Sequence, residues 1–117
     1  MVDDVDGEIS VRGSPALTAE FFYVMRGMML VSDCQRRLEH ATTAEERLHE
    51  ARAGGGALRS VRDSFERIPE LINVLEHSPE ACAMFTQTLG AQRELYEAAR
   101  ARFKATLDGY GLSDEPA

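Results

Sequence analysis

The residues with the most chemical potential in this 117-residue sequence lie around one histidine. His49 is followed by Arg52, Ala53, the glycine run Gly54–Gly56 and the apolar Leu58. In a helix, residues three apart lie on one face, so Arg52 could pair with an anionic group carried by the His49 ring. Small neighbours would let another protein approach that ring closely. These residues make His49 the first candidate for a reactive side chain.

The stretch from His49 to Leu58 resembles the signature helix of histidine-phosphotransfer domains, which are small, acidic, four-helix proteins of about this length. Arginine stands where that family has lysine, and alanine stands where it has glycine. His49 is also six residues from the expected helix start at Thr43, about one turn earlier than in the family. The resemblance implies a phosphoryl carrier at His49 assisted by Arg52, a receiver domain as partner, and no cofactor.

Other reactive groups lack the companions that their chemistry requires. Glu46 and His49 have the Glu-x-x-His spacing of di-iron bundles, but that site needs a second such pair and two more inward glutamates. The expected core faces carry no carboxylate, so the sequence predicts no metal site and no cofactor. Cys34 and Cys82 fall in or beside those faces, where a thiol packs as a small hydrophobe with a raised pKa. We expect no enzyme and no catalytic residue, with His49 and Arg52 as the alternative.

Apolar residues recur at spacings of three and four along three stretches, which is the period of amphipathic helices. Each stretch opens with a start signal: Ser14-Pro15, the capping box of Thr43 and Glu46, and Ser78-Pro79. Asp108-Gly109 and Gly111 end the third. The residues expected in the core are Leu17, Phe21, Val24, Met28, Val31, Gln35 and Leu38, then Ala44, Leu48, Ala51, Gly55, Leu58, Val61, Phe65, Ile68, Ile72 and Leu75, then Cys82, Phe85, Leu89, Gln92, Tyr96, Ala99, Phe103 and Leu107.

Two features of the second stretch disfavour a helix interior. Glycine costs about 1 kcal/mol relative to alanine at each of Gly54–Gly56. Pro69 lacks a backbone donor and disfavours the α region at Ile68, so we expect a kink or a short break there, with one apolar face shared across it. The sequence leaves open whether the glycines end a helix or lie inside one. The predicted fold is all-α: an antiparallel bundle of three long helices, the middle one interrupted near the Gly-rich run and Pro69.

The first expected helix is apolar around most of its circumference. Between residues 21 and 31 its only charge is Arg26. Methionine is over-represented at adaptable protein-binding surfaces, and a stripe wider than a bundle seam leaves apolar area for a partner to cover. Ordinary core is the alternative interpretation. The sequence predicts protein binding and self-association through Phe21, Phe22, Met25, Met28 and Met29.

The formal net charge of −7 is concentrated at the two ends of the chain. We expect flexible acidic tails at 1–13 and 113–117 and one helical bundle domain at 14–112. The bundle is nearly neutral, so it offers no positive field to a nucleic acid, and no apolar run is long enough for a membrane span. Two cysteines without C-x-x-C spacing, and no signal peptide at the start, favour a cytoplasmic location.

These features favour a non-enzymatic protein–protein interaction module, such as an adaptor, regulator or chaperone-like subunit, that forms homodimers. The alternative is a histidine-phosphotransfer protein that relays a phosphoryl group through His49. The two hypotheses differ in one structural feature. The relay requires His49 and Arg52 to be exposed together beside a bare glycine surface on a helix, whereas the interaction module expects the glycines to form a connection.

Overall fold

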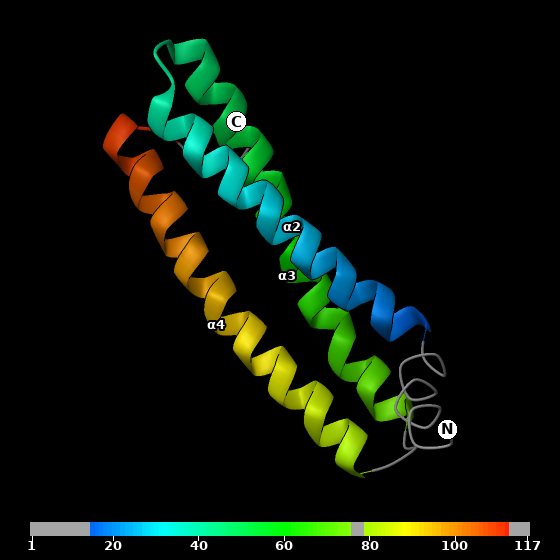
Figure 1. Ribbon diagram of the computed structural model, residues 1–117. Coiled ribbons are helices and arrows are strands. Elements are labelled where there is room, and N and C mark those ends of the chain that lie inside the picture. The colour runs from blue at the N-terminus through cyan, green and yellow to red at the C-terminus, as the bar shows by residue number, and fades with distance from the viewer. Residues whose placement is uncertain (1–14, 76–78, 113–117) are drawn as a thin grey trace, which may run out of the picture.

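The computed structural model describes residues 15–75 and 79–112, and every secondary-structure element within them is an α-helix. Helix α2 spans Pro15–His40, α3 spans Ala44–Leu75 and α4 spans Pro79–Tyr110. Successive helices run antiparallel and form one elongated bundle (Figure 1). The predicted all-α bundle of three long helices is confirmed.

The helix starts agree with the sequence signals wherever the structure describes them. Pro15 and Pro79 are the first residues of α2 and α4, as the sequence predicted. Proline favours the first helical position because its fixed φ suits the helix and its missing N–H would have had no helical partner. Four predicted features lie outside the described residues, namely the tails 1–13 and 113–117 and the capping serines Ser14 and Ser78.

Helix α3 starts at the predicted capping box. The backbone N–H of Glu46 donates to Thr43 Oγ1 at 3.1 Å, and Glu46 Oε1 accepts from the backbone N–H of Thr43 at 3.1 Å. The Thr42 hydroxyl donates to the same carboxylate oxygen at 3.1 Å. These hydrogen bonds, that of the Thr43 hydroxyl above all, lower the pKa of the Glu46 carboxyl. The short connection between α2 and α3 therefore has a defined conformation, which turns the chain back on itself.

Helix α4 ends in a Schellman motif. Gly111 has φ of 70°, and its N–H donates to the carbonyl of Asp108 at 3.1 Å. The N–H of Leu112 donates to the carbonyl of Leu107 at 2.9 Å, and the Leu112 side chain packs against the core. Glycine adopts this left-handed conformation without the steric cost that a Cβ brings. The predicted stop at Gly111 is confirmed, whereas Asp108 and Gly109, which were also predicted to end the helix, lie in its last turn.

The structure does not confirm the predicted interruption of the middle helix. Helix α3 continues without a break through Gly54–Gly56 and through Pro69. The reason at Gly54 is packing, because the fully buried ring of Phe103 on α4 occupies the space that a Cβ would need. Close contact between α3 and α4 thus offsets the poor helix propensity of glycine.

The helix passes Pro69 because another residue supplies the donor that proline lacks. In an unbroken helix, the N–H of residue 69 would donate to the carbonyl of Phe65. That carbonyl instead accepts from Arg93 Nη2 on α4 at 3.2 Å, and the Arg93 guanidinium lies 5.8 Å from the Phe65 ring centroid. Ile68 and Ile72 are both buried in the same core. The predicted face shared across Pro69 is therefore confirmed.

Helices α2 and α3 lie closest together, and α4 lies farther from both (Figure 1). Gly27 is buried where α2 meets α3, and a Cβ there would overlap a methyl group of Val61. The absence of a side chain lets the two backbones approach. On the α4 side, aromatic rings fill the wider space between helices. Phe85 stacks on Phe21 with ring centroids 6.0 Å apart.

The predicted core residues that the structure describes are buried or half-buried except at the start of α3. Ala44 and Leu48 are exposed, whereas the sequence placed them in the core. The half-buried Arg47 occupies this place in the buried stripe instead. The stripe continues through Ala51, Gly54 and Leu58. Those spacings of four and three continue the pattern of the rest of α3 without a change of phase. The side chain of Leu75 lies outside the described residues.

Candidate functional site

The side of α2 that faces away from the bundle carries large apolar residues. Phe22, Met25 and Met29 share this side, and they are 65%, 53% and 67% exposed. Their spacings of three and four place them in one stripe along the helix. A contiguous apolar surface of this kind on a folded protein indicates an interaction site more often than an ordinary surface.

Two more side chains widen this stripe, and neither was among the binding residues predicted from the sequence. Tyr23 is 53% exposed and Leu30 is 46% exposed. They follow Phe22 and Met29 by one residue each, so they share the same seven-residue spacing, and that spacing could have revealed them. We define the outer face of α2 as Phe22, Tyr23, Met25, Met29 and Leu30.

The structure places the five predicted binding residues on two different sides. Phe22, Met25 and Met29 belong to the outer face, whereas Phe21 and Met28 are half-buried and pack against the core. Phe21 packs there because its ring stacks on Phe85 of α4. The structure therefore brings three of the five together on a surface.

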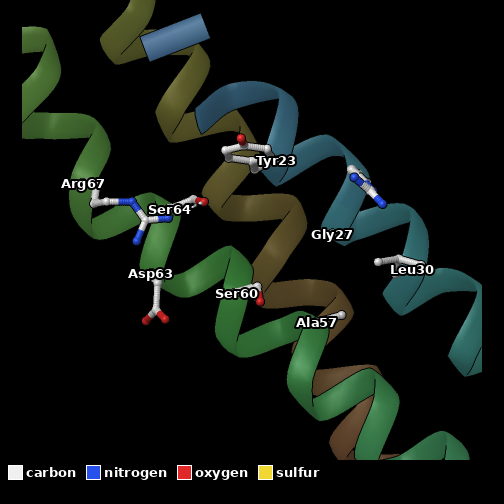
Figure 2. Close-up of a pocket in the computed structure, with 9 residues that line it drawn as sticks. Tyr23, Gly27, Leu30, Ala57, Ser60, Asp63, Ser64 and Arg67 are labelled. Atoms are coloured by element: carbon white, nitrogen blue, oxygen red, sulfur yellow. Dashed lines mark hydrogen bonds between the residues drawn. The ribbon is translucent and has the colours of Figure 1, made fainter. Parts of the chain in front are cut away.

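A groove of about 360 Å³ runs along one edge of the outer face, between α2 and α3. Tyr23 and Leu30 line it from α2, and Ser60 and Ser64 line it from α3 (Figure 2). At its end, Arg67 Nε donates to Glu20 Oε2 at 2.8 Å, and Arg67 Nη2 donates to Glu20 Oε1 at 3.0 Å. The groove gives the outer face a polar border on the α3 side.

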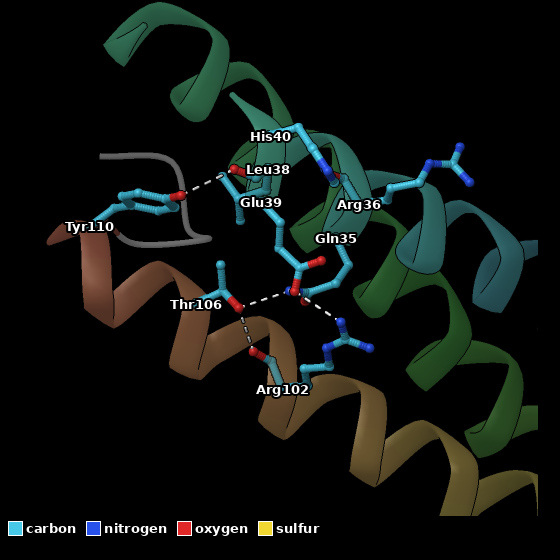
Figure 3. A network of polar contacts seen from close by, with 8 residues as sticks. All are labelled: Gln35, Arg36, Leu38, Glu39, His40, Arg102, Thr106 and Tyr110. Atoms are coloured by element: carbon cyan, nitrogen blue, oxygen red, sulfur yellow. Dashed lines mark hydrogen bonds and ion pairs between the residues drawn. The ribbon is translucent and has the colours of Figure 1, made fainter. Parts of the chain in front are cut away.

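The opposite flank of α2 is joined to α4 by a polar network (Figure 3). Gln35 Nε2 donates to Thr106 Oγ1 at 2.8 Å and to Glu39 Oε2 at 2.9 Å. Arg102 Nη2 donates to the same carboxylate oxygen at 2.9 Å. Arg102 first, and then Gln35, lower the pKa of Glu39. This flank is hydrogen-bonded to α4, so it is not part of the free surface of α2.

Tyr110 joins all three helices near the end of α4. Its hydroxyl donates to the main-chain carbonyl of Leu38 on α2 at 3.3 Å (Figure 3). Its ring lies under the guanidinium of Arg47 on α3, 4.7 Å from Arg47 Cζ to the ring centroid. A cation over an aromatic face stabilises by about 0.5–1 kcal/mol or more. Tyr110 therefore links the end of α4 both to the start of α3, which carries His49, and to the end of α2.

His49 lies on an exposed face of α3, five residues after the helix begins at Ala44. Arg52 and Ala53 are exposed with it, and a Cβ added at Gly56 would meet no atom within 4 Å. Residues 49, 52, 53 and 56 share one face of a helix because they are three, four and seven positions apart. The structure thus places the histidine and the arginine together beside an open glycine. The other two glycines of the run are buried.

A buried carboxylate beneath this region was not predicted. Glu50 is 9% exposed, and its Oε1 accepts from Arg37 Nε on α2 at 3.1 Å. The Arg37 guanidinium also contacts the buried thiol of Cys34, with Nη2 and Sγ 3.7 Å apart. Burial first, and then the nearby negative charge of Glu50, raise the pKa of Cys34. Cys34 is therefore a neutral thiol rather than a nucleophile.

A hollow of about 510 Å³ lies beside His49 at the turn between α2 and α3, lined also by His40 and three glutamates. His40 Nδ1 lies 2.8 Å from the main-chain oxygen of Arg36, which orients its ring along its own helix. Among residues 15–75 and 79–112, no three His, Cys, Asp or Glu side chains are arranged to hold a metal ion. No helix in those ranges is both long and apolar enough to cross a membrane.

The comparisons with known proteins return no relative. No protein-family model, no curated protein and no solved structure matches this chain.

Proposed function

We propose that this protein is a non-enzymatic helical interaction module that binds protein through the outer face of α2 and self-associates there. The observation that carries this proposal is the exposure of Phe22, Met25 and Met29 on one side of a helix whose other side is fully packed. Complete burial of an exposed side chain of this size contributes about 1.5–3 kcal/mol. These three are already partly covered, so a partner that covers the rest gains a part of that free energy from each.

The surface of α4 supports this assignment by contrast. Its large exposed apolar residues are Met84, Leu95 and Tyr110, which are eleven and fifteen positions apart, and the other exposed positions between them are polar or small. Scattered apolar residues of this kind are normal on any protein surface. On α2, five such residues fall within nine positions, and Arg26 is the single charge among them. The adaptor, regulator or chaperone-like roles predicted from the sequence all use such a surface.

Photo-crosslinking at single positions in the cell that produces the protein tests the proposal. A photo-reactive residue replaces Met29 in one variant and Leu95 in another, because both positions are more than half exposed. We expect a protein adduct at position 29 and little or none at position 95, with an adduct of twice the chain mass if the partner is a second copy. Equal crosslinking at the two positions, or none at position 29, contradicts the proposed function.

A second candidate function is phosphoryl relay through His49, and one observation favours it. His49 and Arg52 are exposed on an unbroken helix beside the open position at Gly56. A receiver domain that docks there would meet no large side chain at Gly56, and the Arg52 guanidinium could pair with the phosphoryl group. This relay is an alternative to the interaction module, and it uses a different face of the molecule.

The relay is tested by incubation of the purified protein with a panel of phosphorylated receiver domains. Phosphohistidine is labile in acid and stable in base, so that signature identifies the product. The label should be absent from His49→Gln and present in His40→Gln, since both histidines are exposed near the same turn. Failure of every receiver to label the wild type would leave the interaction module alone.

A further inference from the structure

Two residues of opposite charge on the outer side of α2, Arg26 and Asp33, are placed so that they complement each other across a two-fold axis. Arg36 lies beside Asp33 on the same side. Arg26 and Asp33 are seven positions apart, which is about 10 Å along one face of a helix. Arg26 has no hydrogen bond or ion pair with any residue in 15–75 or 79–112. Asp33 contacts only Arg36 in that part of the chain, at 3.2 Å, and both side chains are well exposed. An exposed pair of this kind contributes little, so Asp33 remains available to another cation.

The sequence order of these charges distinguishes two ways of pairing α2 with a copy of itself. In a parallel pair, Arg26 would face Arg26 of the other copy and Asp33 would face Asp33. In an antiparallel pair centred between residues 29 and 30, Arg26 faces Asp33 of the other copy, and two-fold symmetry repeats that contact. The same centre packs Met29 and Leu30 against their copies in the middle of the interface, where apolar anchors contribute most.

We propose that the outer face of α2 binds a second copy of this chain, with the two α2 helices antiparallel about a two-fold axis beside Met29 and Leu30. This inference rests on the self-association proposed above and adds the orientation and centre of the pairing. A two-fold interface requires one patch to complement itself, and the apolar centre with Arg26 and Asp33 on either side meets that requirement. The paired segment extends over residues 19–40, about 33 Å of helix.

Sedimentation equilibrium of the purified full chain tests the charge contacts. We expect a dimer for the wild type, and dimers weakened about tenfold in dissociation constant for Arg26→Asp alone and for Asp33→Arg alone, because each change creates two like-charge contacts. The double variant Arg26→Asp/Asp33→Arg restores opposite charges and should return to within about threefold of the wild type. Far-UV circular dichroism of each variant checks that the bundle is intact.

Cysteine crosslinking tests the orientation. Met29→Cys lies beside the axis and should form a disulfide-linked dimer on mild oxidation, whereas Phe22→Cys lies far from its own copy and should not. The unsubstituted chain is the control, because it retains Cys34, which is buried, and Cys82, which is half-buried. Equal crosslinking of Phe22→Cys and Met29→Cys indicates a parallel pair and overturns the inference.

The outcomes separate this inference from the interaction function. A wild-type monomer at 100 micromolar, or a dimer indifferent to both single charge reversals, overturns the antiparallel self-pairing. A wild-type monomer also contradicts the self-association part of the proposed function. An adduct of a different mass at position 29 in the cell would keep protein binding through this face and assign the face to another protein. Dimers that follow the charge pattern and link at position 29 support both.

Discussion

The two sides of α2 carry similar side chains but have different surroundings. Val24, Val31 and Leu38 on the inner side are at most 2% exposed, whereas Phe22 and Met29 on the outer side are about two-thirds exposed. Apolar composition therefore does not identify the core side of this helix. The core side is identified by its contacts with α3 and α4. One of these contacts is at Gly27, where no side chain separates α2 from Val61. The inner side holds the fold, and the outer side is available to a partner.

The glycine run of α3 repeats this contrast over three residues. Gly54 lies under the Phe103 ring, whereas Gly56 faces open space. The same residue type thus permits close packing at one position and leaves a bare surface at the other. Substitutions that compare the two sides of each helix should separate effects on the fold from effects on association.

The largest effect is expected from a matched pair of leucines in α2. Leu38 is 0% exposed and Leu30 is 46% exposed. Leu38→Ala should lower the free energy of unfolding by about 2–5 kcal/mol, because it leaves a cavity in the core. Leu30→Ala should cost the isolated chain less than about 1 kcal/mol. Urea unfolding followed by circular dichroism at low micromolar concentration measures both.

Protein concentration sharpens the comparison of the two leucines. If the outer face is covered in a dimer, the apparent stability of the wild type rises with concentration, and Leu30→Ala reduces that rise. Leu38→Ala should destabilise at every concentration. If Leu30→Ala and Leu38→Ala lower the free energy of unfolding by similar amounts in dilute protein, the outer side of α2 also stabilises the fold, and the contrast between the two sides is wrong.

The next effect concerns the two sides of α3. Gly54→Ala places a methyl group against the Phe103 ring and should destabilise by about 1–3 kcal/mol. Gly56→Ala meets nothing and should stabilise by about 0.5–1 kcal/mol, because alanine favours the helix. Thermal unfolding of the two variants gives opposite shifts in Tm. Shifts in Tm of the same sign for the two variants would mean that Gly54 and Gly56 do not differ in their surroundings.

The fold class, the helix starts and the end of α4 were predictable because their signals are local. Thr43 with Glu46, the prolines at 15 and 79, and Gly111 act through hydrogen bonds or dihedral angles within a few residues. Continuity of α3 was not predictable, because it depends on residues distant in sequence. Phe103 covers Gly54, and Arg93 donates to the carbonyl that Pro69 leaves free.

The candidate site shows the same limit. The periodicity of α2 placed Phe21 in the core, but it could not show that the ring packs on Phe85 of α4. The seven-residue spacing could have revealed Tyr23 as an outer residue, but not the groove beside it. At the start of α3, Leu48 was predicted to be in the core because it is apolar. In the structure, the side of the helix that faces the core carries Arg47 and Ala51 instead. Glu50 is buried where Arg37 of α2 pairs with it, and no pattern in the neighbouring sequence indicates that contact.

A smaller effect tests how α4 supports α3 at Pro69. Arg93→Met should remove the hydrogen bond to the Phe65 carbonyl and lower the free energy of unfolding by about 1 kcal/mol. Pro69→Ala restores the helical donor, so the same Arg93→Met change should cost less in that background. A double-mutant cycle by urea unfolding measures the difference. Additive effects would show that Arg93 does not substitute for the missing N–H.

The smallest effect distinguishes the ion pairs on the two sides of α2. Arg67 donates two hydrogen bonds to Glu20, whose side chain is largely covered, whereas the pair of Asp33 and Arg36 is open to solvent. The Arg67 hydrogen bond lowers the pKa of Glu20 below its ordinary value of 4.5. A carboxyl whose pKa is lower in the folded state than in the unfolded state stabilises the fold above the unfolded pKa, and this contribution is lost as pH falls through the folded pKa.

Glu20→Gln should therefore lower the free energy of unfolding by up to about 1 kcal/mol near pH 7, and the difference from the wild type should shrink steadily as the pH falls below 4.5. Asp33→Asn is the matched control on the outer side, and it should change the stability of the dilute monomer by no more than a few tenths of a kcal/mol at either pH. Urea unfolding between pH 3 and pH 7 measures both variants. A Glu20→Gln deficit that stays constant across this range would mean that packing, rather than the charge of Glu20, joins this part of α2 to α3.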